Sequence, residues 1–174
     1  TYSLEDRVLS TTSALGTRTY AYDTGGERVV ERDGAGALTL FARDESGRVL
    51  AELGADGLAR KALLYAGGRL AAELENGELR YLVTDHLGST RVLARMDTGG
   101  VVLDELELFP FGAMMPGSDT PEVDQLFTGH ERDLDSTGLD YMHARYYSSN
   151  LGRFLSVDPV GGTVGSSQSW NRYG

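Results

Sequence analysis

Glycine-containing turns return along the first half of this chain at an almost constant interval, and this interval constrains the fold more than any other feature. Four segments superpose on their last glycine, and the steps between those glycines are 21, 21 and 20 residues. The aligned glycines are Gly26, Gly47, Gly68 and Gly88. A fixed period of this length indicates a structural repeat in which each unit packs on its neighbours.

A second series of turns lies between the first, at Asp33-Gly34 with Gly36, at Asp56-Gly57 and at Asn76-Gly77. Asp-Gly and Asn-Gly favour tight hairpin turns because these turns require positive φ. Each period therefore predicts a strand, a turn, a second strand and a second turn.

Apolar and polar residues alternate between the turns, as expected for strands with two different faces. The predicted faces are Leu70, Ala72 and Leu74 against Arg69, Ala71 and Glu73; Leu79, Tyr81 and Val83 against Arg80, Leu82 and Thr84; and Val92, Ala94 and Met96 against Arg91, Leu93 and Arg95. Only residues 120–124 predict a helix, of one or two turns, with Thr120 as its cap and Pro121 at its first position. The pattern predicts an all-β chain of antiparallel hairpins, although periodicity alone also permits an ordinary antiparallel sandwich or barrel.

The composition excludes several classes of function. A formal net charge of −10 over 174 residues argues against nucleic acid or an anionic membrane as a partner. The chain has no cysteine, which excludes disulfides and thiolate metal sites. No apolar run approaches the roughly 20 residues of a membrane-spanning helix. Because the chain starts at Thr1 without a methionine and stops at Gly174 within a motif, we expect it to be a fragment of a longer protein.

The residues that most often bind metals or ligands form no recognisable site. The three histidines have no metal-ligand spacing and are more typical of strand and turn positions; they are His86, His130 and His143. No glycine-rich phosphate loop opens a helix, so we expect neither a cofactor nor a metal. Three tyrosines are expected in the core or at its rim, with sugar or a partner as the alternative contact; they are Tyr141, Tyr146 and Tyr147.

The second half of the chain carries the most specific motif. It runs from Phe127-Thr128-Gly129-His130-Glu131-Arg132-Asp133 through residues 137–141, 144–147 and 152–156 to Asp158-Pro159, and it is preceded by Asp85-His86-Leu87-Gly88-Ser89-Thr90-Arg91 and Pro110-Phe111-Gly112. In this order the segments resemble the RHS repeat-associated core. That core is the closing segment of the RHS/YD-repeat polymorphic toxins and of the C component of Tc toxins. The resemblance is specific from about residue 81 to residue 173, and before that it is at the level of the repeat.

The resemblance implies that the YD-repeat hairpins form part of a spiralling, hollow RHS shell that the core domain closes. It divides the chain into repeat strands at residues 1–80 and the core domain at residues 81–174, truncated before the family's cleavage motif. Gly88, Gly112 and Gly152 would fit the sharp corners that a curled sheet needs.

The resemblance also implies a chemical role for Arg145 and Asp158. In RHS toxins the core domain acts as an aspartyl autoprotease that cuts the chain once, after a later Asp-Pro-x-Gly-Leu motif. Arg145 and Asp158 match the family's conserved arginine and first aspartate. From the residues alone, Tyr141, His143, Arg145 and Tyr147 alternate on one predicted strand face, and the turn at residues 148–152 brings the chain back toward Asp158. An arginine beside an aspartate favours its ionised form, which one carboxyl of an aspartyl dyad requires.

Part of this chemistry is predicted to lie outside the chain. The second aspartate and the cleavage point would follow Gly174, so the fragment itself is predicted to be inactive. Ser148-Ser149 also stand where the family usually has Asp-Pro, in a turn that we do not expect to be catalytic. The alternative for Arg145 and Asp158 is a plain ion pair that closes a turn, with Asp158 capping the backbone before Pro159.

Taken together, the sequence predicts a structural shell segment of an RHS-repeat toxin, which encapsulates a C-terminal toxic domain and releases it by autoproteolysis in the full-length chain. The implied partners are the C-terminal toxin or effector domain of the same parent chain, the remaining RHS repeats and the components of a delivery system. The implied location is secreted or on a bacterial cell surface, with a cytoplasmic stage before delivery. Two alternatives stay open: a cell-surface adhesion or carbohydrate-binding YD-repeat module, and an orphan RHS end without a toxin.

Overall fold

The computed structural model describes residues 1–3, 7–116, 121–134, 137–143 and 145–158, together with residues 171 and 173. The first sheet has ten strands: β1 (Ser10–Ser13), β2 (Gly16–Tyr22), β3 (Arg28–Arg32), β4 (Leu38–Arg43), β5 (Val49–Gly54), β6 (Ala59–Ala66), β7 (Arg69–Glu75), β8 (Glu78–Thr84), β9 (Thr90–Asp97) and β10 (Gly100–Glu105). The second has four: β11 (Glu131–Arg132), β12 (Asp140–Met142), β13 (Arg145–Ser148) and β14 (Arg153–Phe154). A short 3-10 segment, η1 (Phe127–Gly129), precedes β11.

The ten strands of the first sheet follow one another in chain order, and each is antiparallel to the next. The predicted antiparallel all-β fold is therefore confirmed, and every predicted turn between residues 22 and 88 occurs. Among the described strands β1 pairs only with β2 and β10 only with β9, so this sheet has two open edges.

Five of the turns begin with an aspartate whose side chain binds the backbone of the turn, whereas the turns at Gly67-Gly68 and Asn76-Gly77 have no such aspartate. Asp44 Oδ1 accepts hydrogen bonds from the backbone N–H groups of Ser46 and Arg48, at 2.9 and 3.0 Å. The Gly47 N–H donates to the Asp44 carbonyl oxygen at 3.0 Å, and Gly47 has a φ of +81°, which glycine adopts without steric cost. Similar side chain–backbone bonds recur at Asp23, Asp33, Asp56 and Asp85. The turns are thus specified by residues only a few positions apart.

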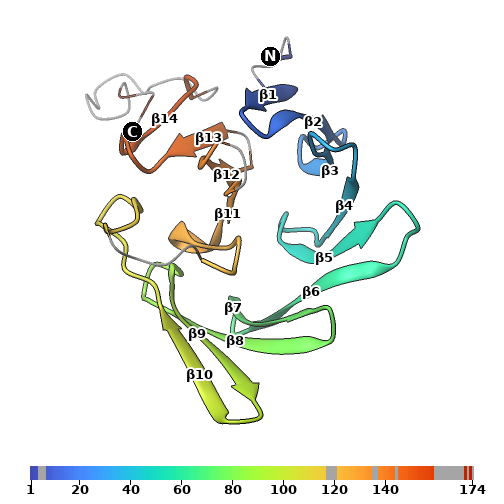
Figure 1. Ribbon diagram of the computed structural model, residues 1–174. Coiled ribbons are helices and arrows are strands. Elements are labelled where there is room, and N and C mark those ends of the chain that lie inside the picture. The colour runs from blue at the N-terminus through green and yellow to red at the C-terminus, as the bar shows by residue number, and fades with distance from the viewer. Residues whose placement is uncertain are drawn as a thin grey trace.

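The ten-stranded sheet curves around the segment that carries η1, β11 and β12 (Figure 1). On its concave face Leu63, Leu82 and Leu93 pack in one cluster with Val123 and Leu126, which are fully buried. A second cluster joins the start of the sheet to the hairpin of β12 and β13; its buried members are Val8, Tyr20, Tyr141 and Tyr146. All three tyrosines expected in the core or at its rim are buried, including Tyr147.

The convex face of β6 to β10 exposes large apolar side chains. We call this set the apolar outer face; its members are Leu64, Leu74, Leu79, Tyr81, Val83, Met96, Val101 and Leu103. The strand register places Tyr81 opposite Ala94 and Ala94 opposite Leu103, so the set forms a continuous surface. The concave face instead buries charged side chains such as Lys61 and Arg80. The convex face therefore departs from the usual preference for a polar surface, and the concave face buries charged side chains beside its apolar cluster.

β7 departs from the predicted alternation. β6 pairs with Leu70 and with Ala72 but leaves Ala71 without a partner, which is the pattern of a β-bulge. Leu70 consequently lies on the concave face at 6% exposure, whereas Leu74 is 42% exposed on the convex face and Glu73 is buried. The prediction that Leu70, Ala72 and Leu74 share one face is therefore wrong, because one extra residue exchanges the faces of a strand.

The predicted helix at residues 120–124 is also not found. Thr120 lies outside the described residues, and Pro121 to Leu126 contain no helical turn. This segment runs instead across the concave face, where Val123 and Leu126 enter the core. The carboxylates of Glu122 and Asp124 meet cations of the sheet. No helix in the described part of the chain is long and apolar enough to span a membrane. The boundary proposed between residues 80 and 81 falls inside β8 and stays a prediction.

The three glycines predicted at corners all take positive φ, with values of +89° at Gly88, +86° at Gly112 and +65° at Gly152. Gly112 is the most tightly packed, because a Cβ atom there would lie 2.4 Å from Phe127 Cγ. The corner at Gly112 therefore needs glycine both for its backbone conformation and for the close approach of η1.

Candidate functional site

The two residues predicted for autoproteolysis lie at the end of the smaller sheet. The chain turns sharply between β12 and β13, where Met142 pairs with Arg145 and His143 has a φ of +54°. The prediction that residues 141–147 alternate along one strand face is therefore wrong. His143 Nδ1 lies 2.8 Å from Glu27 Oε2, and this contact stabilises a backbone conformation that non-glycine residues rarely adopt.

The chain then returns beside β13 and brings Asp158 to Arg145. The turn closes through backbone hydrogen bonds to the Ser148 carbonyl oxygen, and β14 pairs with β13. Arg145 Nη2 lies 3.0 Å from Asp158 Oδ2, with the side chains 13% and 33% exposed. The Arg145 guanidinium also lies 3.6 Å from the centre of the Phe154 ring. The structure thus brings the predicted pair together in a partly buried position.

A second carboxylate is what an aspartyl dyad would still need beside Asp158. The two aspartates nearest in the motif are buried, and each has its own arginine. Asp133 Oδ1 accepts a hydrogen bond from Arg28 at 2.8 Å, and both carboxylate oxygens of Asp140 accept from Arg132 at 2.8 Å. Burial raises the pKa of Asp140, while Arg132 lowers it. These two aspartates hold the core together and are not placed to serve as the second carboxyl.

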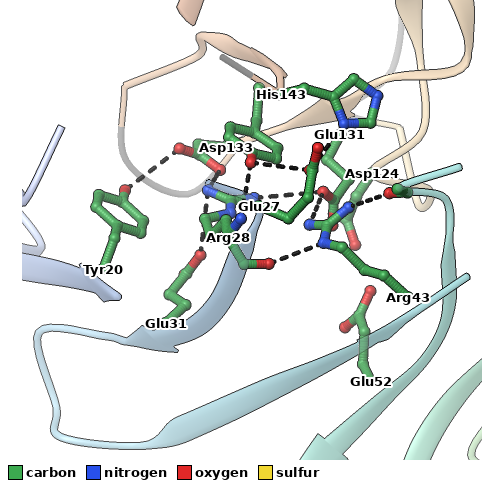
Figure 2. A network of polar contacts seen from close by, with 12 residues as sticks. Tyr20, Glu27, Arg28, Glu31, Arg43, Glu52, Asp124, Glu131, Asp133 and His143 are labelled. Atoms are coloured by element: carbon green, nitrogen blue, oxygen red, sulfur yellow. Dashed lines mark hydrogen bonds and ion pairs between the residues drawn. The ribbon is translucent and has the colours of Figure 1, made fainter. Parts of the chain in front are cut away.

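Arg28 is the centre of the contact between the two sheets (Figure 2). Its side chain is 2% exposed, and Nη1 donates to Asp133 at 2.8 Å and to the Tyr146 hydroxyl at 3.2 Å. Glu31 and Glu131 lie 3.6 and 3.8 Å from the guanidinium. Three rings surround it, with centres 4.6 to 5.3 Å away; they belong to Tyr141, Phe41 and Tyr20. Burial lowers the pKa of Arg28, but Asp133 and the other carboxylates outweigh burial and raise it.

Arg43 makes a second connection beside the first. Its Nη2 atom lies 2.7 Å from Glu131 Oε2, and its Nε–H donates to the Arg28 carbonyl oxygen at 2.8 Å. Figure 2 shows Arg28 and Arg43 side by side, each pointing toward Glu131. Strands β3 and β4 of the large sheet are therefore joined to β11 by two buried arginines.

The segment before η1 attaches to later strands of the large sheet in the same manner. Asp124 Oδ2 lies 2.5 Å from Lys61 Nζ, and Glu122 Oε2 lies 3.1 Å from Arg95 Nη1. Burial raises the pKa of Glu52 to about 7, with Lys61 opposing and Asp124 adding to the effect. The concave face therefore holds its contents by ion pairs as well as by apolar packing.

Sequence reasoning did not single out Arg28. Arg48 and Arg69 follow aligned glycines of the repeat in nearly the same position, yet the Arg48 side chain is 41% exposed and Arg69 is also exposed. What distinguishes Arg28 is Asp133, a residue 105 positions away. The available signal was Glu131-Arg132-Asp133 itself, because three consecutive charged residues within a core motif require buried partners of opposite charge.

Two of the three histidines lie next to each other. The rings of His130 and His143 meet edge to face with centres 5.5 Å apart. Burial, and then the neighbouring His143, lower the pKa of His130. In the part of the chain that the structure describes, no group of three or more histidine, aspartate or glutamate side chains could hold a metal ion.

Known proteins match this chain over most of its length. No protein-family model matches it. The chain is 31% identical over 159 residues to the tRNA3(Ser)-specific nuclease WapA of Bacillus spizizenii, which covers 89% of this chain and 7% of WapA. It is 34% identical over 92 residues to toxin subunit YenC1 of Yersinia entomophaga, which covers 51% of this chain and 9% of YenC1. The chain thus spans less than a tenth of the length of either relative.

The fold also matches a solved structure. One chain in the crystal structure of TcdB2-TccC3-Cdc42 superposes with a TM-score of 0.73 at 20% identity, over 99% of this chain and 9% of that chain. The curved sheet and the segment inside it therefore occur together as one part of a much longer protein.

Proposed function

The chain belongs to the RHS/YD-repeat proteins, and on that basis we propose that it is a shell segment that encloses a C-terminal toxic domain of its parent chain. The similarity to WapA, named a nuclease, and to YenC1, named a toxin subunit, supports a toxin as the parent. The same similarity supports a secreted or surface location and an association with further repeats and delivery components. The observation that carries the enclosing role is the apolar outer face.

The apolar outer face is unsuited to water. Met96, Val101 and Leu103 are 60 to 65% exposed, and Tyr81 and Val83 are 49 and 56% exposed. Continuous apolar surfaces of this kind mark sites of contact with another polypeptide. The concave face is already filled by the chain's own core segment, so this fragment does not itself surround the C-terminal domain. Its convex face would instead form part of the inner wall of the longer shell, against which that domain lies.

Cysteine labelling tests the enclosing role, because the chain contains no cysteine of its own. We expect Leu103→Cys to react readily with a maleimide in the 174-residue chain. In the parent protein, with any other cysteines replaced, it should be protected, and deletion of the C-terminal domain should expose it again. Arg60→Cys serves as the control, because Arg60 is outside the apolar outer face and its side chain is 56% exposed in its ion pair with Asp56. If Leu103→Cys reacts equally with and without the C-terminal domain, that domain does not lie on this face.

We further propose that Arg145 and Asp158 form part of an aspartyl autoprotease in the longer chain. The support is their 3.0 Å contact in a partly buried position, together with the motif they match. Arg145 orients the Asp158 carboxylate, and a second aspartate beyond Gly174 would share a water with it, as the chemistry of a carboxyl dyad requires.

Intact-mass spectrometry of a chain extended through the downstream Asp-Pro-x-Gly-Leu motif tests this assignment. We expect one internal cut in the unchanged protein, none in Asp158→Asn and a slow or absent cut in Arg145→Ala. Asp133→Asn is unsuitable as a control, because Asp133 is buried against Arg28. Asp104→Asn is better matched, since Asp104 is 38% exposed and pairs with a single arginine. Cleavage of the Asp158→Asn protein at the same bond would show that Asp158 only closes a turn.

A further inference from the structure

A cleft of about 310 Å³ lies between the turns of the repeat and the segment that follows the core residue Leu126. Gly47, Gly68 and Gly88, the aligned glycines of three consecutive repeats, line one side of it. His130 and Glu131 line the other. Its volume is at the lower end of the range for small-molecule sites, which suits one ligand of about the size of a single sugar ring.

Gln125 contributes an unusual polar group to this cleft. The residue is 2% exposed, and neither its side-chain nitrogen nor its side-chain oxygen has a hydrogen-bond partner among the described residues. Its backbone is fixed, because the Gln125 carbonyl oxygen accepts a hydrogen bond from Thr90 Oγ1 at 2.6 Å. An unpaired buried amide is costly. A hydroxyl group satisfies both its atoms, since a hydroxyl can donate and accept, whereas a bare carboxylate can only accept.

Three arginines line the cleft, although the whole chain carries a net charge of −10; they are Arg43, Arg48 and Arg69. Arg43 is paired with Glu131, which also lines the cleft. Arg69 donates only to the carbonyl oxygens of Asp85 and His86, at 3.2 and 3.4 Å, and no described carboxylate forms an ion pair with it. Arg48 is paired with Asp44 and lies 5.1 Å from the centre of the Tyr65 ring. Arg69 is therefore the uncompensated cation of this site, and Tyr65 supplies an apolar wall.

We propose that this cleft binds a small carboxylate that carries hydroxyl groups. The carboxylate pairs with Arg69, which presents the forked donors that suit this group. A hydroxyl group occupies the unpaired amide of Gln125. The apolar edge of the ligand packs against Tyr65.

Titration of three probes into the 174-residue chain, followed by calorimetry, distinguishes the carboxylate contact with Arg69 from the hydroxyl contact with Gln125. D-glucuronate carries both groups, D-glucose only the hydroxyls and acetate only the carboxylate. We expect glucuronate to bind about tenfold or more tightly than either of the others, as one added charged hydrogen bond predicts. Equal binding of all three, or no binding of glucuronate, would overturn the proposal.

Two substitutions locate the binding. Arg69→Gln should weaken glucuronate about tenfold, to the level of glucose, and leave glucose unchanged. Gln125→Met should weaken both, because it replaces the amide with an apolar chain of similar size. Arg60→Gln, an exposed arginine outside the cleft, should change neither. If Gln125→Met does not fold, the test is the comparison of glucuronate affinity between Arg69→Gln and Arg60→Gln. Equal affinity in these two proteins would show that glucuronate does not bind in this cleft.

Discussion

Replacing Arg28 with methionine should destabilise the protein more than any exposed charge substitution. Methionine approximates the length of the side chain and removes its charge. Asp133, whose side chain is 4% exposed, would then lose the guanidinium 2.8 Å away, and Glu131 would keep only Arg43. Breaking a buried pair by removing one partner costs about 3–5 kcal/mol, because the remaining charge stays buried. The three surrounding rings would lose their contact with the guanidinium as well.

Urea unfolding followed by circular dichroism measures this effect. For a chain of this size a loss of about 3–5 kcal/mol also corresponds to a fall in Tm of about 6–20 °C. The matched control is Arg60→Met, whose ion pair with Asp56 has side chains 56% and 46% exposed and should contribute about 0–1 kcal/mol.

A double substitution separates the charge from the packing. If the cost of Arg28→Met comes from the stranded carboxylate, Asp133→Leu in the same protein should recover part of it. We expect a coupling free energy of about 2–3 kcal/mol between the two positions. A loss below about 1 kcal/mol for Arg28→Met, or additive effects in the double variant, would refute the assignment of Arg28 as the buried link between the sheets.

Three further outcomes follow from single residues. In urea unfolding, Gly112→Ala should lower the free energy of unfolding by well over the roughly 1 kcal/mol expected for Gly77→Ala. Both glycines have φ near +85°, but only at Gly112 would a Cβ atom lie 2.4 Å from Phe127, so equal losses would contradict this reason. Since burial raises the pKa of Glu52 to about 7, above about 4.3 in an unfolded chain, stability falls as the pH rises between these values. In urea unfolding, Glu52→Gln should therefore have a free energy of unfolding up to about 3 kcal/mol higher than the unchanged protein at pH 8, and the same free energy at pH 4. A difference that does not depend on pH would show that ionisation of Glu52 is not its cause. We expect the isolated chain to associate through the apolar outer face, so Leu103→Lys should reduce the particle size in light scattering. An unchanged particle size would show that this face does not drive association.

The parts of the fold that could be predicted are those specified locally. Asp44 and Gly47 lie within one turn, and the chemistry of that turn is complete within five residues. The bulge at Ala71 could not be predicted, because nothing in its own strand distinguishes it and it arises from the register with β6. The hairpin at His143 depends in the same way on Glu27, a residue 116 positions away.

In the candidate site, too, the contacts made within one hairpin could be predicted, and those made only in the tertiary structure could not. Arg145 and Asp158 are 13 positions apart and joined by one hairpin, so their contact could be predicted even though the strand before it was misassigned. Arg28 and Asp133 are joined only through the tertiary structure. Their pairing requires knowing that the sheet curves back on the segment after β10, which no short-range pattern specifies.

The order of strands in the large sheet has a consequence for how the chain reaches its native state. Each strand pairs with the next one synthesised, so only short loops need to close as the sheet grows. Contacts of this kind form quickly, whereas those between Arg28 and Asp133 must wait until 105 further residues have emerged. During synthesis the growing sheet would therefore hold cations whose closest carboxylate partners are still missing; Arg28 awaits Asp133, and Lys61 awaits Asp124. The arrival of that segment is then the event that commits the sheet to its final curvature.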